Sequence, residues 1–268
     1  WKEMETNVSL RVEETDTKDT FLVSGRGELH LSILIETMRR EGYEMQVSQP
    51  QVIIQTIDDV EMEPYEHLTV DVPESFQGAV MEALGERGGE LLVMSPVAGN
   101  EIHLEYTIPT RGVIGLKTEL MTSTRGNAIM HHVFDQYQPL GENTPSPNIH
   151  GSMIASVPGS STGYALNSAQ GRGTLFIAPG RDVYTGMIVG QHVRDLDLEY
   201  NVCKTKNLTN MRASGADDAI VLTPPKQITL EYALEYIGSD ELIEVTPKNI
   251  RLRKKLLDAH DRKRKKAA

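Results

Sequence analysis

The sequence predicts an α+β protein in which two split βαβ domains, the first truncated, precede a β-rich C-terminal domain. Strand and helix patterns alternate over residues 1–60 and follow the order βαββαβ over residues 61–140. From residue 141 to residue 268 the pattern changes to short strands separated by glycine-bearing turns. A chain of 268 residues is expected to hold two or three domains, so we place boundaries near residues 60 and 140.

Residues 1–60 open with two expected strands, VSLRVEE and TFLVSG, and continue into a helix expected from Glu28 to Glu41. Apolar residues recur at helical spacing from Leu31 to Met38, and Gly42 is expected to end the helix. The strand YEMQVSQPQVIIQT follows, interrupted by Pro50 at an edge or a bulge. This order is the second part of a split βαβ sandwich, so a leading strand and helix are missing.

The joint SGRGELHLSI between the second strand and the helix has some features of a phosphate-binding loop. It lacks the third glycine of a dinucleotide loop and the lysine and hydroxyl of a Walker loop, and Glu28 would repel phosphate. We interpret Gly25 and Gly27 as a structural turn that draws on the access of glycine to positive φ. No site for GTP or ATP hydrolysis is therefore predicted in this chain.

Residues 61–140 carry the clearest architecture. PYEHLTVDV reads as a strand, and PESFQGAVMEALGERGG as a helix opened by Pro73 and closed by Gly88. ELLVMSPV and EIHLEYTIP form an expected hairpin, a second helix spans 112–123, and NAIMHHVFDQY is the last strand. This is the order of a ferredoxin-like sandwich, with both helices on one face of an antiparallel sheet.

Residues 141–268 begin with GENTPSPN, a linker or surface excursion, and continue as a compact, mainly β domain or small barrel. The expected strands are SMIASV, TGYALN, GTLFIAPG, VYTGMIVGQH and LEYNVCK. One helix is expected from Thr229 to Ile237. The only cysteine, Cys203, is expected to be buried in a strand. A single cysteine cannot form a disulfide within the chain, which fits a reducing cytosol.

Charge is distributed unevenly. Residues 251–268 contain nine Lys/Arg and two Asp, a net charge of +7, whereas the whole chain carries −11 and the first 250 residues −18. An acidic body with a basic end is suited to touching nucleic acid at one place. The alternative reading of the basic end is a solvated, disordered terminus.

No membrane segment or signal peptide is expected, because apolar runs such as LSILI are short and the start WKEMETNVSL has neither a basic flank nor an apolar stretch. These features, with the single cysteine, predict a cytoplasmic protein.

Two catalytic readings are weak. GSSTG matches the elbow of serine hydrolases with Ser161 as nucleophile, but the flanks are β-rich and neither His192 nor His260 has an acidic partner at a family-like spacing. His131 and His132 are adjacent in a strand, so their side chains point to opposite faces and cannot share a metal. We expect no catalytic residue, no metal and no cofactor in this chain.

The segment CKTKNLTNMRASGADDA is different because cations and hydrogen-bonding side chains gather in a stretch with few apolar residues. Lysine and arginine can pair with phosphates while amides and hydroxyls reach sugars and base edges, as in RNA recognition. The alternative is an ordinary polar loop, and no aromatic stacking platform is expected. The candidate residues are Lys204, Lys206, Asn207, Thr209, Asn210, Arg212 and Ser214.

Several blocks of the sequence resemble known families. SGRGELHLSILIETMRREGYEMQVSQPQV is similar to the third domain of translational GTPases related to elongation factor G. PYEHLTVDVPESFQGAVMEALGERGGELLVM and TRGVIGLKTELMTSTRGNAIMHHVFDQY resemble their fifth, ferredoxin-like domain. RGTLFIAPGRDVYTGMIVGQH, KNLTNMRASGADDA, LTPPKQITLEYALEYI and DELIEVTPKNIRLRKK look like the domain peculiar to the BipA/TypA family. The resemblance runs through nearly the whole chain.

The resemblance implies a C-terminal fragment of a ribosome-binding translational GTPase concerned with stress adaptation and large-subunit assembly. By this resemblance, the domain that would bind GTP and Mg²⁺ is expected to lie outside this sequence. The implied partners are the ribosome, large-subunit ribosomal RNA and the acceptor end of A-site tRNA, with the chain as a monomer. The expected RNA contacts are Lys204, Lys206, Asn207, Asn210, Arg212 and Ser214 in the loop, and Arg253, Lys254 and Lys255 near the basic end. A protein-interaction module without RNA binding stays open as an alternative.

Overall fold

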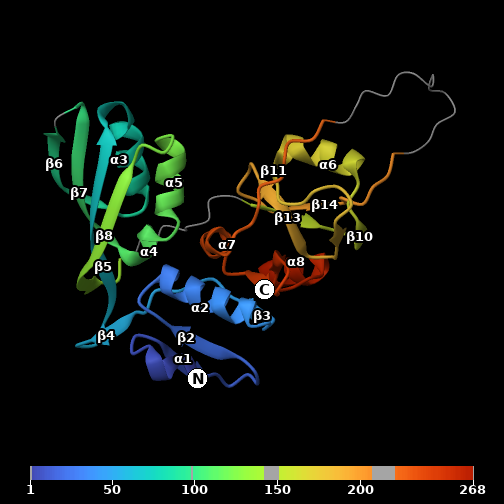
Figure 1. The fold of residues 1–268 in the computed structure, drawn as a ribbon, viewed down its shortest axis with the longest axis horizontal. Helices are drawn as coiled ribbons and strands as arrows, with labels where there is room; N and C mark the ends of the chain where they lie inside the picture. The colour runs from blue at the N-terminus through green and yellow to red at the C-terminus, as the bar shows by residue number, and fades with distance from the viewer. Residues whose placement is uncertain (1, 98, 142–150, 207–220, 268) are drawn as a thin grey trace. The chain divides into compact units, whose positions relative to one another are not determined.

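The computed structural model describes residues 2–97, 99–141, 151–206 and 221–267 and confirms the α+β class (Figure 1). By its contacts the chain forms two compact units. Unit 1 combines residues 1–49 with residues 148–268, and unit 2 comprises residues 50–147. Unit 2 is thus inserted in the sequence of unit 1. The three-part division with boundaries near residues 60 and 140 stays a prediction.

Unit 2 has the expected order of strands and helices. Its antiparallel sheet is ordered β8-β5-β7-β6, and β4 pairs with the start of β5. The strands are β4 (Gln55–Ile57), β5 (Val60–Pro73), β6 (Glu90–Val97), β7 (Glu101–Pro109) and β8 (Ile129–Pro139). The helices are η1 (Glu74–Phe76), α3 (Gln77–Glu86), α4 (Thr110–Val113) and α5 (Leu116–Ser123). The second predicted helix is broken in two because Gly115 has a φ of 72°.

Alternation along the central strands gives the sheet of unit 2 two different faces. Leu68, Val70 and Val72 of β5 are fully buried, whereas the residues between them are partly exposed. Both α3 and α5 lie on the buried side (Figure 1). They contribute Val80, Leu84, Leu116 and Leu120 to the core. Burying each such side chain stabilises the unit by about 1.5–3 kcal/mol before the loss of conformational entropy.

Unit 1 is built on a seven-stranded sheet ordered β14-β9-β13-β16-β15-β3, with β11 also paired to β13. All pairs are antiparallel except β14 with β9. The strands are β3 (Met45–Val47), β9 (Ser152–Ala155), β11 (Gly173–Leu175), β13 (Met187–His192), β14 (Leu198–Tyr200), β15 (Glu241–Val245) and β16 (Ile250–Lys254). A separate ladder joins β10 (Gly159–Ser160) to β12 (Asp182–Val183).

The N-terminal segment of unit 1 joins this sheet through its last strand. β1 (Arg11–Glu14) and β2 (Phe21–Ser24) form their own hairpin, after α1 (Lys2–Thr6). The expected helix is α2 (Glu28–Arg40), and Gly42 follows it with a φ of 97°. α2 packs on α7 (Leu230–Tyr236), and Ile35 lies in the same core as Leu234. Arg39 donates to the carbonyl of Pro247 at 2.8 Å, between β15 and β16.

Two strand predictions were wrong. The single strand expected over YEMQVSQPQVIIQT is instead β3 and β4, which belong to sheets in different units. TGYALN forms α6 (Gly163–Ala169), because Thr162 accepts a hydrogen bond from the Ala165 amide at 3.2 Å and caps a helix. The buried side chains Ala165, Leu166 and Ala169 recur at helical spacing. The remaining helices are η2 (Gln170–Arg172) and α8 (Ala259–Ala267).

The glycine turn at the start of α2 is a structural joint, but positive φ is not its cause. Gly27 is extended, with a φ of 172°. A Cβ on Gly25 would approach the imidazole of His30 at 2.9 Å. Close approach therefore favours glycine at position 25. None of the helices in the described ranges combines the length and hydropathy needed to cross a membrane.

Candidate nucleic-acid interface

The structure brings some predicted RNA-binding residues onto defined elements of unit 1. Lys204 and Lys206 lie after β14, Arg253 and Lys254 end β16, and Lys255 follows. The other predicted contacts lie outside the described residues, and they are Asn207, Asn210, Arg212 and Ser214.

The base of the candidate loop is tied to the start of α6. The Thr162 hydroxyl donates to the carbonyl of Lys204 at 2.5 Å, and the Thr162 amide donates to the carbonyl of Val202 at 2.9 Å. Val202 is buried, whereas the side chain of Lys204 is exposed. Cys203 is half-buried in this turn and not in a strand, which corrects the expectation from the sequence. The loop therefore leaves a well-anchored base with an exposed cation at its start.

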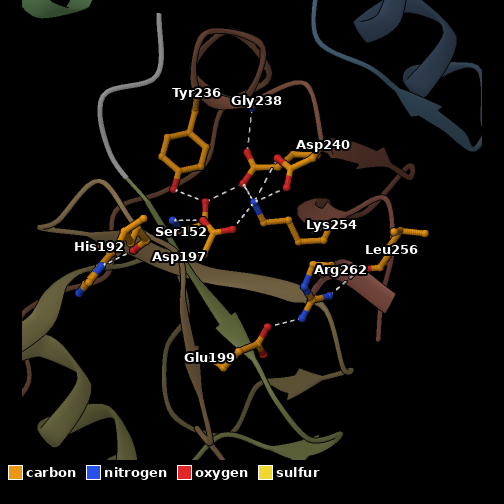
Figure 2. Close-up of polar contacts among 12 residues, drawn as sticks. Ser152, His192, Asp197, Glu199, Tyr236, Gly238, Asp240, Lys254, Leu256 and Arg262 are labelled. Atoms are coloured by element: carbon orange, nitrogen blue, oxygen red, sulfur yellow. Dashed lines mark hydrogen bonds and ion pairs between the residues drawn. The ribbon is translucent and has the colours of Figure 1, made fainter. Parts of the chain in front are cut away.

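Lys254 has a different environment (Figure 2). Its side chain is 3% exposed, and its ammonium lies 2.8 Å from Asp197, 2.9 Å from Glu241 and 3.1 Å from Asp240. Burial alone would lower the pKa of Lys254, but the charges of Glu241 and Asp197 and their hydrogen bonds outweigh it, and the pKa is raised. The ammonium is therefore held charged inside unit 1.

Neutral groups complete the cluster around Lys254. The Ser152 hydroxyl donates to Glu241 Oε1 at 2.7 Å and lies 2.8 Å from the hydroxyl of Tyr236. The amide of Gly238 donates to Glu241 Oε2 at 2.9 Å. The Ser152 amide in turn donates to Asp197 at 2.9 Å. Since these groups come from β9, β16, α7 and the start of β15, the cluster joins several elements of unit 1, and its geometry argues against an RNA-binding role for Lys254.

The neighbouring cations differ in how far they are exposed. Arg253 is 17% exposed and lies 3.7 Å from Glu244. Lys255 is exposed, and its ammonium donates to the carbonyl of Ser239 at 2.6 Å. Arg262 in α8 is paired with Glu199 (Figure 2). Among the described residues of α8, the exposed cations are Lys263, Arg264 and Lys265. The basic end is thus partly helical, with Lys255 and α8 as its accessible cations.

The hydrolase reading of GSSTG does not fit the structure. Ser161 is 3% exposed, its hydroxyl donates to the carbonyl of Ala178 at 2.9 Å, and it accepts from the amide of Arg181 at 3.0 Å. No histidine or carboxylate bonds to it within the described part of the chain. Ser161 therefore holds a turn and does not act as a nucleophile.

The described residues contain no group of three or more His, Cys, Asp or Glu that could hold a metal ion. His131 and His132 pair with Thr69 and Leu68, so they face opposite sides of the sheet, as predicted. His132 is hydrogen-bonded to Glu66.

The sequence-based reading missed a chain of histidines and carboxylates on unit 2. Asp71 Oδ1 accepts a hydrogen bond from His103 Nδ1 at 2.6 Å, and Glu105 lies 3.4 Å from His103 Nε2 and 3.5 Å from His67 Nε2. The hydrogen bond to Asp71 raises the pKa of His103. The sequence does contain a sign of this chain of residues. His67 and Asp71, and likewise His103 and Glu105, are separated by an even number of positions, which places each pair on one face of a strand. This sign could be read only once β5 and β7 were known to be neighbours.

Comparison with known families gives matches to two consecutive segments of the chain. Residues 150–259 match the TypA/BipA C-terminal domain, and residues 60–146 match the C-terminus of elongation factor G. These matches define the class as proteins that join an elongation-factor-G C-terminal domain to a TypA/BipA C-terminal domain. Residues 150–259 are therefore similar to the C-terminal domain of the BipA/TypA family.

Relatives with the name "Large ribosomal subunit assembly factor BipA" are similar over almost the whole chain. The protein of Escherichia coli K12 is 50% identical and that of Haemophilus influenzae 52% identical, each over 98% of this chain. The protein of Synechocystis sp. PCC 6803 is 51% identical over 94% of it. The chain spans 42–43% of the length of these relatives.

Proposed function

We propose that this chain is the ribosome-docking part of a BipA-like factor that acts in large ribosomal subunit assembly. Its role is binding, and the proposed partners are large-subunit ribosomal RNA and the acceptor end of tRNA, without bond-making chemistry in these residues. It works as a monomer in the cytoplasm, under conditions of stress. The name of the similar proteins and the match of residues 150–259 to the TypA/BipA C-terminal domain support this proposal.

The observation that carries the RNA-binding part is the division of charge between two segments of the chain, the C-terminal segment of unit 1 and the segment that forms unit 2. Residues 148–268 contain seventeen Lys/Arg and thirteen Asp/Glu, a net charge of +4. Residues 50–147 contain four Lys/Arg and fifteen Asp/Glu, a net charge of −11. A polyanion is attracted to the first segment and repelled by the second, and cations near phosphate release counterions from RNA.

The proposed contact surface is narrower than the one expected from sequence. It consists of the loop that begins at Lys204, together with Lys255 and the exposed cations of α8. Arg253 and Lys254 are left out because their charged groups lie beside carboxylates of unit 1. Phosphate contacts of this kind position a protein on RNA, while hydroxyl and amide groups of the loop would read sugars and base edges.

The test is ribosome pelleting at a series of salt concentrations. Replacing Lys204, Lys206 and Arg212 together by Ala is expected to weaken binding and to make the slope of log K against log[salt] shallower by about two. The matched control K18A/K117A/R125A removes three exposed cations elsewhere and should leave the slope unchanged. An equal loss of slope in both variants would contradict the proposal, and salt-resistant binding without RNA would identify a protein-interaction module.

A further inference from the structure

The sheet of unit 2 has one face that no described element of this unit covers. α3 and α5 cover the opposite face. Since the side chains of β5 and β7 alternate, the uncovered face carries His67, Thr69 and Asp71 from β5, and Glu101, His103 and Glu105 from β7. We call this surface the open face.

The carboxylates at the centre of the open face are partly exposed and share their histidine partners. The side chains of Asp71 and Glu105 are 39% and 31% exposed. Each lies within hydrogen-bonding or ion-pairing distance of His103, and Glu105 also approaches His67. Asp71 raises the pKa of His103, so this imidazole can hold a proton near neutral pH, but the carboxylates of Asp71, Glu101 and Glu105 outnumber that single positive charge and leave the centre of the face anionic.

Apolar side chains border this anionic centre on both edge strands. In β6, Val93 pairs with Glu105 and Val97 with Glu101. In β8, the exposed Ile129 and Val133 pair with Asp71 and His67, and therefore lie on the same face. An extended segment with alternating cationic and apolar residues would match this order of charge and apolar surface.

The cations of unit 2 do not offset its negative charge on the surface. Arg87 is buried and donates to Glu119 at 2.6 and 2.9 Å, and Arg111 lies 2.9 Å from the buried Glu63. That leaves Lys117 and Arg125 as its exposed Lys/Arg side chains in the described ranges. With a net charge of −11 over residues 50–147, this unit repels RNA phosphate and attracts a cationic partner.

We propose that the open face of unit 2 is a docking surface for a basic protein segment, whose lysine or arginine side chains bind Asp71 and Glu105 between the apolar borders. Charge complementarity decides in favour of a protein and against a nucleic acid. The inference does not depend on the RNA contacts of unit 1, because it concerns separate residues and the opposite sign of charge.

Such docking depends on pH, since protons compete with the partner. The charged or titratable groups that face His103 are Asp71 and His67 of β5, Glu105 and Glu101 of β7, and His131 of β8, with Ser95 on β6. Protonated imidazoles would neutralise the carboxylates and repel incoming cations. Binding is therefore expected to be weaker at pH 5.5 than at pH 8.5, because the raised pKa of His103 means that its imidazole loses the competing proton only above the usual histidine range.

The experiment uses the whole 268-residue chain labelled with ¹⁵N and titrated with a synthetic peptide of about twelve alternating Lys and Val residues. The residues alternate because successive side chains of an extended strand point to opposite faces. Amide shifts are expected on β5 and β7, with weaker binding at pH 5.5. A single-stranded oligouridine of equal length should leave these amides unmoved. This mapping needs no variant, so it remains informative whatever the stability of mutants.

The matched variants are D71N/E105Q and E82Q/E86Q, each of which removes two negative charges from unit 2. The first acts on the open face and is expected to weaken peptide binding about fivefold, as for two partly exposed ion pairs. The second acts on exposed positions of α3 and should change it by less than about twofold. Equal weakening by both, peptide shifts outside the open face, or oligouridine shifts on it would overturn the proposal.

Discussion

Each unit contains a cluster of carboxylates around basic side chains, but the two clusters differ in burial. In unit 1, Lys254 and Glu241 are each 3% exposed, and the lysine meets three carboxylates. In unit 2, His103 is 28% exposed and lies on a sheet face beside water. A desolvated charge depends on its partners, whereas a hydrated charge can exchange them. The carboxylates around Lys254 thus stabilise the fold of unit 1, whereas those around His103 in unit 2 are accessible to a binding partner.

The largest expected effect comes from removing the buried cation. Lys254→Met leaves Glu241 and its neighbouring carboxylates without their counter-charge and is expected to destabilise unit 1 by about 3–5 kcal/mol. Urea unfolding followed by hydrogen exchange in β9, β13 and β16 measures the loss. The matched variant Lys255→Met removes an exposed lysine and should cost less than about 0.5 kcal/mol. Similar losses for the two lysines would contradict the contrast in burial.

A smaller effect is expected at Arg87, the buried cation of unit 2. Besides Glu119, its guanidinium donates to the carbonyls of Gly112 and Ile114 at 2.9 and 2.7 Å, and so joins the end of α3 to α4 and α5. Arg87→Met should destabilise unit 2 by about 2–3 kcal/mol. Thermal unfolding of unit 2 is the measurement, with Lys117→Met as the exposed control. If Arg87→Met is as mild as its control, the cations of unit 2 do not have the structural role inferred here.

The smallest effect is the pH dependence of the open face. Because the folded-state pKa of His103 is raised by Asp71, its contribution to stability is fully present below the unfolded-state pKa and is lost as the pH rises through the folded value. Unit 2 should therefore lose a contribution of less than about 1 kcal/mol between pH 6 and pH 8.5, since the pair is partly exposed.

The measurement for His103 is an NMR titration of its imidazole together with unfolding at the two pH values. His103→Gln should remove this part of the pH dependence while leaving other contributions in place. A titration midpoint at or below that of an unperturbed histidine would show that Asp71 does not stabilise the charged ring.

Local patterns allowed much of the fold to be predicted. The helix α2, the order of elements in unit 2 and the helix α7 follow from apolar periodicity and from capping or glycine signals near their ends. The opposite faces of His131 and His132 follow from the pleat alone. These features depend on residues close together in sequence, so that a single sequence carries them.

Features set by distant contacts could not be predicted. The apolar strand pattern at β3 gave no indication that its partner would be β15, and Lys254 was expected to contact RNA as part of a basic run. Three carboxylates from elsewhere in the chain bury that lysine, and only their positions in space reveal it. TGYALN was predicted as a strand because its neighbours are strands separated by glycine-bearing turns. It forms the start of α6 instead, because Thr162 caps the first turn and three side chains of this helix are buried at helical spacing.

The pairing of β3 with β15 has a consequence for folding during translation. Val47 lies opposite Ile243 in the ladder, so β3 must await a partner that is translated about two hundred residues later, which takes about 10–40 s at ordinary speeds of synthesis. Unit 2 can finish folding in that interval, while the edge and apolar residues of β3 have no lasting partner. Until β15 (Glu241–Val245) has been translated, the unpaired edge of β3 is therefore exposed to misassembly with other strands.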